Sequence, residues 1–273
     1  MASILAIDAA WTAFEPSGIA LLHGEEGDWR CQAVAPSYEQ FVDLVNGSRV
    51  DWTARPTGNE PAVEEWLRIA EHLNGAPVDL VTVDMPLSMS VINGRRAADD
   101  AISRAFGGRG CGTHTPNVKR PGEISDQLRI DFAELGYPLG TTRTPFGTTP
   151  ALIEVYPHPA LLLLLGADYR VPDKASRAGR YWPLLSPTER RRKIAGIWQE
   201  IYGALAANFS VSDLPLPTPD EAEHLRTSEL KRFEDGLDAL ICGWVGIGYL
   251  QGRCTAYGDE TAAIWTPSPK AIE

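Results

Sequence analysis

Four aspartates stand where their side chains could bind metal ions together. Asp8 and Asp84 each follow a short apolar run that is typical of a buried strand. Ligands collect at the ends of strands in mixed α/β sheets, so we expect these two carboxylates to face each other. Asp235 and Asp238 lie close together in an apolar segment that favours a helix, and both side chains would therefore project to one side.

Carboxylates gathered in this way favour one kind of chemistry. Like charges repel unless a cation neutralises them, and hard oxygen ligands prefer Mg²⁺ or Mn²⁺ to zinc. Two such ions can clamp a phosphodiester, one activating water and the other stabilising the leaving oxygen. Each acid alone would be interpreted more simply, as a turn residue or as part of a solvated helix face. Together, Asp8, Asp84, Asp235 and Asp238 indicate a metal site for phosphodiester hydrolysis.

The elements that would position these acids can be predicted from apolar periodicity and helix-capping residues. We expect strands at residues 4–8, 18–22, 29–34, 78–83, 151–156 and 262–265. We expect helices at residues 37–45, 61–73, 94–107, 124–135, 159–165, 186–209 and 228–250. Glycine, proline and polar residues predict an exposed loop at 107–121 and a linker at 212–219.

Composition limits the classes of protein to which the chain can belong. It has 273 residues, of which 44% are hydrophobic and 22% charged, enough apolar material for a packed core. A formal charge of -11 argues against a protein that coats polyanions with a wholly basic surface. Any contact with nucleic acid must therefore be local or mediated by metal.

No segment predicts a membrane location. The N-terminus lacks a basic leader region and a cleavage site, and the apolar stretch 239–250 is too short and too rich in glycine to span a bilayer. We therefore expect a cytoplasmic protein without membrane contact.

The basic residues are concentrated in one part of this acidic chain. Lys174, Arg177 and Arg180 are followed by a run of four basic residues at 190–193. Such a region can bind phosphate, or it can form a solvated helix face. Both interpretations remain open, and the first makes Lys174, Arg177 and Arg180 candidates for substrate binding.

The order of elements and acids resembles the RNase-H-like superfamily, particularly resolvases of the RuvC type. Three strands, a helix and a further strand open the chain, with an acid on the first and fourth strands and Asp-x-x-Asp on the last long helix. The resemblance implies a mixed five-stranded α/β sheet flanked by helices. It also implies metal-dependent hydrolysis of phosphodiesters.

Smaller motifs resemble the family of predicted RNase-H-like nucleases known as domain of unknown function 429. These motifs are Val83-Asp84-Met85-Pro86, Arg96-Ala97-Ala98-Asp99, Ile153-Glu154-Val155-Tyr156-Pro157, Asp235-Gly236-Leu237-Asp238 and Ile264-Trp265-Thr266-Pro267. Each is short, but their order and spacing together are specific, and they cover most of the chain. The resemblance adds Arg96 as a substrate-binding candidate and Glu154 as a catalytic one. Glu154 could be a metal ligand, or it could orient a ligand or an arginine.

These observations lead to one hypothesis and two alternatives. We expect a single RNase-H-like domain over 1–273, with insertions near 94–137 and 167–219, that uses two Mg²⁺ or Mn²⁺ ions to hydrolyse DNA, RNA or another phosphodiester. One alternative is a phosphotransferase of the sugar-kinase and actin class, although the sequence shows no second set of three opening strands. The other is a non-catalytic binding module that keeps the fold. Oligomeric state does not follow from the sequence.

Overall fold

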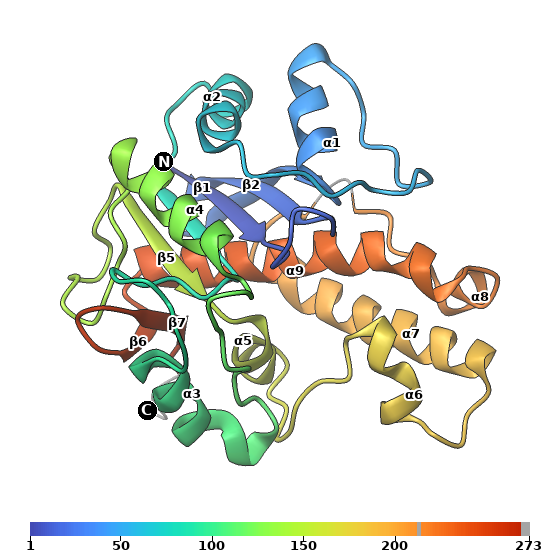
Figure 1. The fold of residues 1–273 in the computed structure, drawn as a ribbon. Coiled ribbons are helices and arrows are strands. Elements are labelled where there is room, and N and C mark those ends of the chain that lie inside the picture. Colours follow the sequence, from blue (N-terminus) through green and yellow to red (C-terminus); the bar gives the residue numbers. More distant parts are fainter. Residues whose placement is uncertain (212–213, 269–273) are drawn as a thin grey trace.

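One mixed sheet of seven strands runs through the computed structural model, which describes residues 1–211 and 214–268. Its strand order is β3-β2-β1-β4-β5-β7-β6 (Figure 1). The strands are β1 Ala2–Asp8, β2 Gly18–Glu25, β3 Asp28–Ala35, β4 Leu80–Val83, β5 Ala151–Val155, β6 Cys254–Gly258 and β7 Ala263–Pro267. Strands β1 to β3 are antiparallel neighbours, β1, β4, β5 and β7 run parallel, and β6 is antiparallel to β7.

The predicted mixed α/β class is confirmed, but the predicted count of five strands is wrong. The closing strand expected at 262–265 is β7, and it lies beside β5. The sequence analysis missed β6, which forms the edge of the sheet. Only the first of its five residues is buried, so it lacks the apolar run that revealed the other strands.

Helices cover both faces of this sheet. The α-helices are α1 Tyr38–Asp43, α2 Val63–Asn74, α3 Ala97–Phe106, α4 Glu123–Glu134, α5 Pro157–Leu164, α6 Ala178–Tyr181, α7 Pro187–Ala206, α8 Pro219–Ala222 and α9 Thr227–Leu250, with 3-10 turns at Leu44–Asn46, Gly107–Arg109 and Ala175–Arg177. The predicted helix starts follow from local capping. Ser37 accepts a hydrogen bond from the backbone of Gln40, and Ser186 forms a reciprocal capping box with Glu189.

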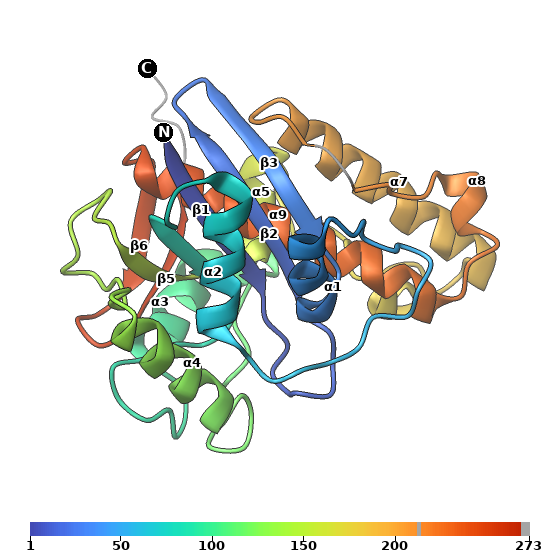
Figure 2. The same cartoon turned by 90° about the horizontal axis from the view of Figure 1, so that it is seen from above.

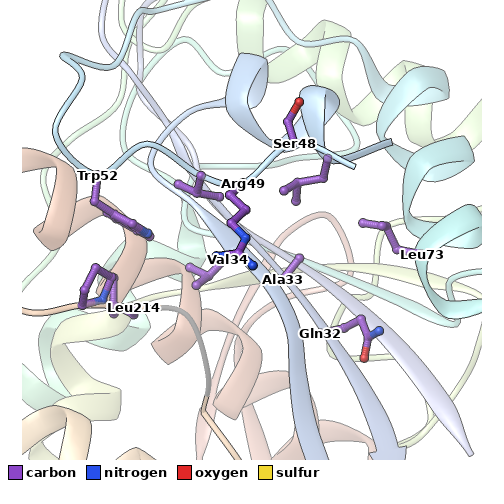
Figure 3. Close-up of a pocket in the computed structure, with 11 residues that line it drawn as sticks. Gln32, Ala33, Val34, Ser48, Arg49, Trp52, Leu73 and Leu214 are labelled. Atoms are coloured by element: carbon purple, nitrogen blue, oxygen red, sulfur yellow. The ribbon is translucent and has the colours of Figure 1, made fainter. Parts of the chain in front are cut away.

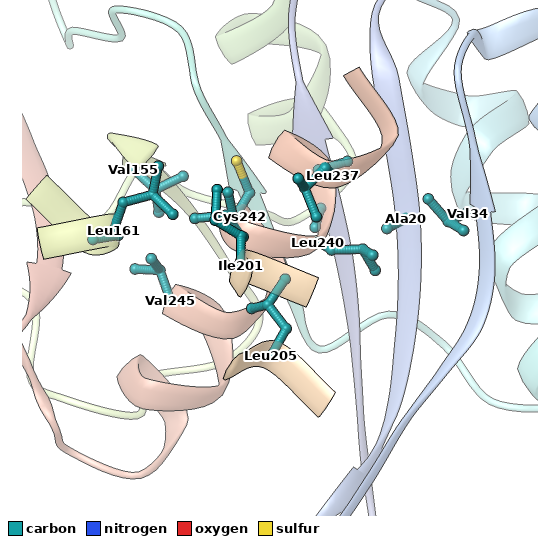
Figure 4. Close-up of a cluster of buried hydrophobic side chains, with 14 of the residues drawn as sticks. Ala20, Val34, Val155, Leu161, Ile201, Leu205, Leu237, Leu240, Cys242 and Val245 are labelled. Atoms are coloured by element: carbon teal, nitrogen blue, oxygen red, sulfur yellow. The ribbon is translucent and has the colours of Figure 1, made fainter. Parts of the chain in front are cut away.

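Two apolar layers hold the helices to the sheet. Helices α1, α2 and α4 pack on one face through residues such as Phe41, Trp66 and Phe132 (Figure 2). Helices α5, α7 and α9 pack on the other face, where Leu240 and Val245 of α9 lie in the core (Figure 4). The predicted linker at 212–219 falls partly outside the described residues. Within the described ranges, no helix combines the length and apolar character that a membrane span requires.

Helix α9 approaches the sheet closely because glycines form its inner surface. A Cβ atom at Gly243 would lie 2.5 Å from a methyl group of Leu22, and one at Gly246 would lie 2.9 Å from Thr82. These distances leave no room for a side chain, so the helix backbone packs almost directly on β2 and β4. Polar groups on the helix are thereby brought within reach of the strand ends.

Candidate functional site

Asp8 and Asp84 lie side by side where neighbouring parallel strands end. The register pairs Ile7 with Val83, and the backbone N–H of Asp84 donates to the carbonyl of Ile7 at 2.9 Å. Adjacent strands are about 4.8 Å apart. Side chains alternate along a strand. Asp8 has the parity of Ala6 and Asp84 that of Leu80, and both apolar residues pack in the α9 layer. Both carboxylates therefore face the same helix.

Helix α9 brings the other two predicted aspartates to this point. Asp8 pairs with Gly18 on the neighbouring strand β2. A Cβ atom added at Gly18 would lie 1.9 Å from the backbone oxygen of Asp235. The helix thus touches the strand directly beside Asp8. Asp235 is fully buried and Asp238 is 2% exposed. The structure therefore brings all four predicted aspartates to one region of the molecule.

Two lysines lie among these acids. The ammonium group of Lys174 hydrogen-bonds to the Asp238 carboxylate and lies 3.8 Å from carboxylate oxygens of both Asp173 and Glu234. The ammonium group of Lys231 pairs with Asp235 one helical turn away. The sequence analysis predicted Lys174 as a substrate contact, and the structure places it inside the acid cluster.

Three members of the cluster were missed by the sequence analysis. Asp173 and Glu234 are buried beside Lys174, and Lys231 is spaced four residues from Asp235 on α9. That spacing is a readable signal, because residues at i and i+4 meet on a helix surface. Asp173 carries no comparable signal, since it comes from an irregular segment far from α9 in the sequence.

Burial and mutual repulsion raise the pKa values of the four aspartates. Burial is the largest cause for each, and the charge of Asp8 adds to the rise at Asp84, Asp235 and Asp238. The pKa of Asp235 rises to about 8 even though Lys231 lowers it. The charged forms are therefore costly, and a further cation at the site would stabilise them.

The donor atoms fit a hard divalent cation, with one restriction. The side-chain oxygen Oδ2 of Asp235 is buried without a hydrogen-bond partner. However, among the described residues no three His, Cys, Asp or Glu side chains are grouped closely enough to hold one ion as they stand. Mg²⁺ is commonly bound by one or two carboxylates together with water and substrate phosphates. Asp8 and Asp84 supply that number from adjacent strands.

The acids open onto a cleft of about 760 Å³. Asp8, Asp84 and Asp235 lie along it, and Trp11, Arg170 and Arg177 are among the other residues that line it. This volume lies within the range of 300–1,000 Å³ that is usual for ligand pockets. A charged substrate could therefore reach Asp8 and Asp84 from solvent.

Comparison with known proteins places the chain in a family. The model of the family described as "Protein of unknown function (DUF429)" matches residues 15–262. The chain belongs to this family. The DUF429 match includes Asp84, Asp235 and Asp238, whereas Asp8 lies before its first matched residue. No curated protein and no solved structure matches the chain.

In this DUF429 chain, Glu154 and Arg96 form a buried ion pair outside the lining of the acidic cleft, although the charge of Glu154 contributes to the raised pKa of Asp84. Glu154 has the parity of Leu152 in β5, which packs in the layer opposite α9. Its carboxylate accepts hydrogen bonds from both terminal nitrogens of Arg96, at 2.6 Å and 2.7 Å. It also accepts from the backbone N–H of Leu87 at 2.8 Å. Neither Glu154 nor Arg96 is among the residues that line the acidic cleft.

The Arg96 pair fixes the turn that follows Asp84. Arg96 donates to the carbonyl of Leu87 at 2.6 Å and forms an ion pair with Asp99 at 2.9 Å. Glu154 and Arg96 together therefore hold both backbone groups of Leu87, three residues beyond Asp84. In this structure Glu154 therefore orients an arginine. This is one of the two roles that the sequence analysis left open for Glu154.

The remaining predicted basic residues separate into two groups. Arg177 lines the acidic cleft, whereas Arg180 is exposed on α6 and is not part of its lining. In the run at 190–193, Arg190 donates to two backbone carbonyls, and Arg192 pairs with Asp220 and Glu223. Arg190 and Arg192 thus have partners within the chain at the surface.

A second cavity of similar size lies at the β3 edge of the sheet (Figure 3). Its volume is about 750 Å³, and Val34, Trp52 and Leu214 contribute to its wall. Among the described residues that line it are Arg49 and no carboxylate. The acidic cleft, where carboxylates and arginines meet, is therefore the candidate site.

Proposed function

We propose that this protein hydrolyses phosphodiester bonds of nucleic acid with the help of divalent metal ions. The observation that carries the proposal is the adjacency of Asp8 and Asp84 at the ends of β1 and β4, beside Asp235 and Asp238, at an open cleft. The strand order β3-β2-β1-β4-β5, with only the first three strands antiparallel, supports an RNase-H-like core.

These residues would have different roles in such a site. Asp8 and Asp84 would hold Mg²⁺ or Mn²⁺, and the unpartnered Oδ2 of Asp235 would supply a further oxygen beside them. The metal supplies positive charge that stabilises the pentacoordinate transition state. Lys174 and Lys231 hold the carboxylates of Asp238 and Asp235 in place, which limits the repulsion between the acids when no metal is bound.

Thermal melts and cleavage assays with Asp84→Asn test this proposal. Mn²⁺ should raise the melting temperature of the wild type clearly and that of the variant little, because the variant lacks one of the two metal-binding carboxylates. Asp28→Asn is the matched control, since it removes the same charge at an exposed position on β3. Cleavage of labelled DNA or RNA should require metal and should be lost only in Asp84→Asn. Equal metal-induced shifts in all three proteins would contradict the proposal.

One observation favours a second candidate function, a binding module without catalysis. Lys174 and Lys231 already pair with Asp238 and Asp235, so part of the negative charge is compensated within the chain. A module of this kind would bind nucleic acid in EDTA as well as in Mn²⁺, and it would cleave none. Binding and cleavage measured on the same substrate separate the two functions.

A further inference from the structure

Three arginines line the cleft onto which Asp8, Asp84 and Asp235 open. Arg120 comes from the loop before α4, Arg170 from the segment after α5, and Arg177 from the 3-10 turn Ala175–Arg177. Arg170 and Arg177 lie close together in the sequence, whereas Arg120 comes from a distant segment, and the fold brings all three to one cavity. Arginine is the side chain best suited to phosphate, because its planar fork donates two parallel hydrogen bonds.

The partners of these arginines within hydrogen-bonding or stacking distance are neutral, whereas other arginines of this chain pair with carboxylates. The charge of Arg170 also acts on the buried carboxylate of Asp173 and lowers its pKa. A terminal nitrogen of Arg170 lies 2.5 Å from Nε2 of His158, and one of Arg177 lies 3.2 Å from Nε2 of His114. The guanidinium of Arg120 lies over the ring of Trp11, 5.8 Å from its centre. Stacking on an aromatic ring restrains a guanidinium without cancelling its charge.

No ion pair neutralises these arginines within residues 1–211 and 214–268. By contrast, Arg96 and Arg192 each pair with two carboxylates. The chain as a whole has 36 acidic residues against 25 lysines and arginines, so carboxylates are abundant. The positive charge of the cleft is therefore left available to an anion that comes from outside.

Buried polar atoms beside the arginines also lack partners. Nε of Arg170 is buried without a hydrogen bond, and so is Nδ1 of His158, a residue that is only 8% exposed. Leaving a buried donor unsatisfied costs about 1–3 kcal/mol. Burial, together with the nearby charges of Lys174 and Arg170, holds the pKa of His158 well below its usual value. His158 is therefore neutral and can accept the hydrogen bond from Arg170.

We infer that Arg120, Arg170 and Arg177 form a phosphate site for the phosphodiester next to the one that lies at Asp8 and Asp84. The inference rests on the proposed function and names its substrate class: a nucleic-acid strand with at least two consecutive phosphates. Without metal, the acids repel a phosphate, whereas the arginines attract one. A strand that spans both places is therefore held by the arginines and presents its next phosphate to the acids. Phosphate contacts carry no base identity, so binding is tolerant of sequence.

Binding of a short fluorescent oligothymidylate in EDTA, across a salt series, tests the site without cleavage. Arg177→Ala and Arg170→Ala should each weaken binding about tenfold and reduce the salt slope by about one unit, because each removes one phosphate contact. Arg68→Ala is the matched control, since Arg68 is exposed on α2, on the opposite face of the sheet. Among the described residues, the side chain of Arg177 has one hydrogen bond, with His114. Arg177→Ala should therefore keep the fold even if Arg170→Ala does not.

Competition by thymidine monophosphate tests the requirement for two phosphates. The mononucleotide should compete far more weakly than the oligonucleotide. Equal competition, or binding by Arg177→Ala that matches Arg68→Ala at every salt concentration, would overturn the site.

These experiments distinguish failure of the phosphate site from failure of the proposed function. If the arginine variants weaken binding while no metal supports cleavage, the phosphate site stands and the nuclease proposal fails. If metal supports cleavage that is lost in Asp84→Asn while the arginine variants bind normally, the nuclease stands and the phosphate site fails.

Discussion

Two clusters of buried charge lie on opposite faces of the sheet, and they differ in how their charges are balanced. On the face away from α9, Glu154 and Asp99 share the guanidinium of Arg96, and the backbone of Leu87 completes the hydrogen bonds. On the α9 face, carboxylates outnumber the two ammonium groups of Lys174 and Lys231 among the described residues.

The comparison shows how a structural charge cluster can be distinguished from a functional one. The Arg96 cluster is closed, because its carboxylates and guanidinium are satisfied by each other and by backbone groups. Burial raises carboxylate pKa values in both clusters, at Glu154 and at Asp235. The α9 cluster differs because it opens onto a cleft and retains an unpartnered oxygen at Asp235. Perturbed pKa values together with an open cleft indicate a functional site.

Asp84→Asn should have the largest effect on activity. Replacing an outer partner of a metal site typically costs 10–100-fold, so the loss of a direct ligand should cost at least about 100-fold in cleavage rate. The melting temperature without metal should stay the same or rise, because the substitution removes one charge from a repelling cluster. Rates and melts measured on one preparation check both parts. A large loss of stability without metal would show that the two clusters do not differ as described.

Glu154→Gln should give the opposite pattern. It leaves the buried guanidinium of Arg96 with one carboxylate partner, and breaking a buried ion pair costs about 3 kcal/mol. Urea unfolding should show this loss, whereas metal binding by the folded fraction should remain. Loss of metal binding without loss of stability would instead make Glu154 a ligand.

Gly18→Ala should disturb the α9 cluster through the backbone. The new Cβ would overlap the backbone oxygen of Asp235, so α9 must shift, at a cost of about 1–3 kcal/mol. The shift should also weaken the response of the melting temperature to Mn²⁺. Gly196→Ala is the control, because nothing lies within 4 Å of its added Cβ and alanine favours its helix. A Gly18 variant that melts like this control would refute the close contact.

The last expected effect is a dependence of stability on pH. Asp235 has a pKa of about 8 in the folded protein, against an ordinary value of 3.8, so the folded state binds the proton more tightly. Its contribution to stability is complete below 3.8 and is lost as the pH rises towards about 8. The raised pKa values of Lys174 and Lys231 contribute no slope in this window, since both stay protonated. Melting temperatures across this range should fall less steeply for Asp235→Asn than for the wild type.

Much of the fold and of the acid cluster could be predicted from the sequence, because the signals are local. Apolar runs that end in Asp8 and Asp84 revealed two strands, and the spacing of Asp235 and Asp238 revealed one side of a helix. Strand β6 could not be predicted, since an exposed edge strand has no continuous apolar run. The DUF429 family was recognised from short motifs and is confirmed by the match over residues 15–262.

The face on which Glu154 lies could not be predicted. Strand β5 is buried on both sides, so its residues do not alternate between apolar and polar, and the sequence contains no record of which side faces α9. The pairing of Lys174 with Asp238 was hidden for a different reason. It joins positions 64 residues apart, and only the packing of the segment after α5 against α9 brings them together.

The close contact of α9 with the sheet has a consequence for biosynthesis. Asp8 and Asp84 belong to the first third of the chain, whereas Asp235 and Asp238 arrive with a helix that begins at Thr227. A ribosome releases the N-terminal strands first, so a nascent chain carries two exposed carboxylates and no helix to cover them. The cluster is assembled only after α9 has been synthesised, and any product truncated before α9 lacks Asp235 and Asp238.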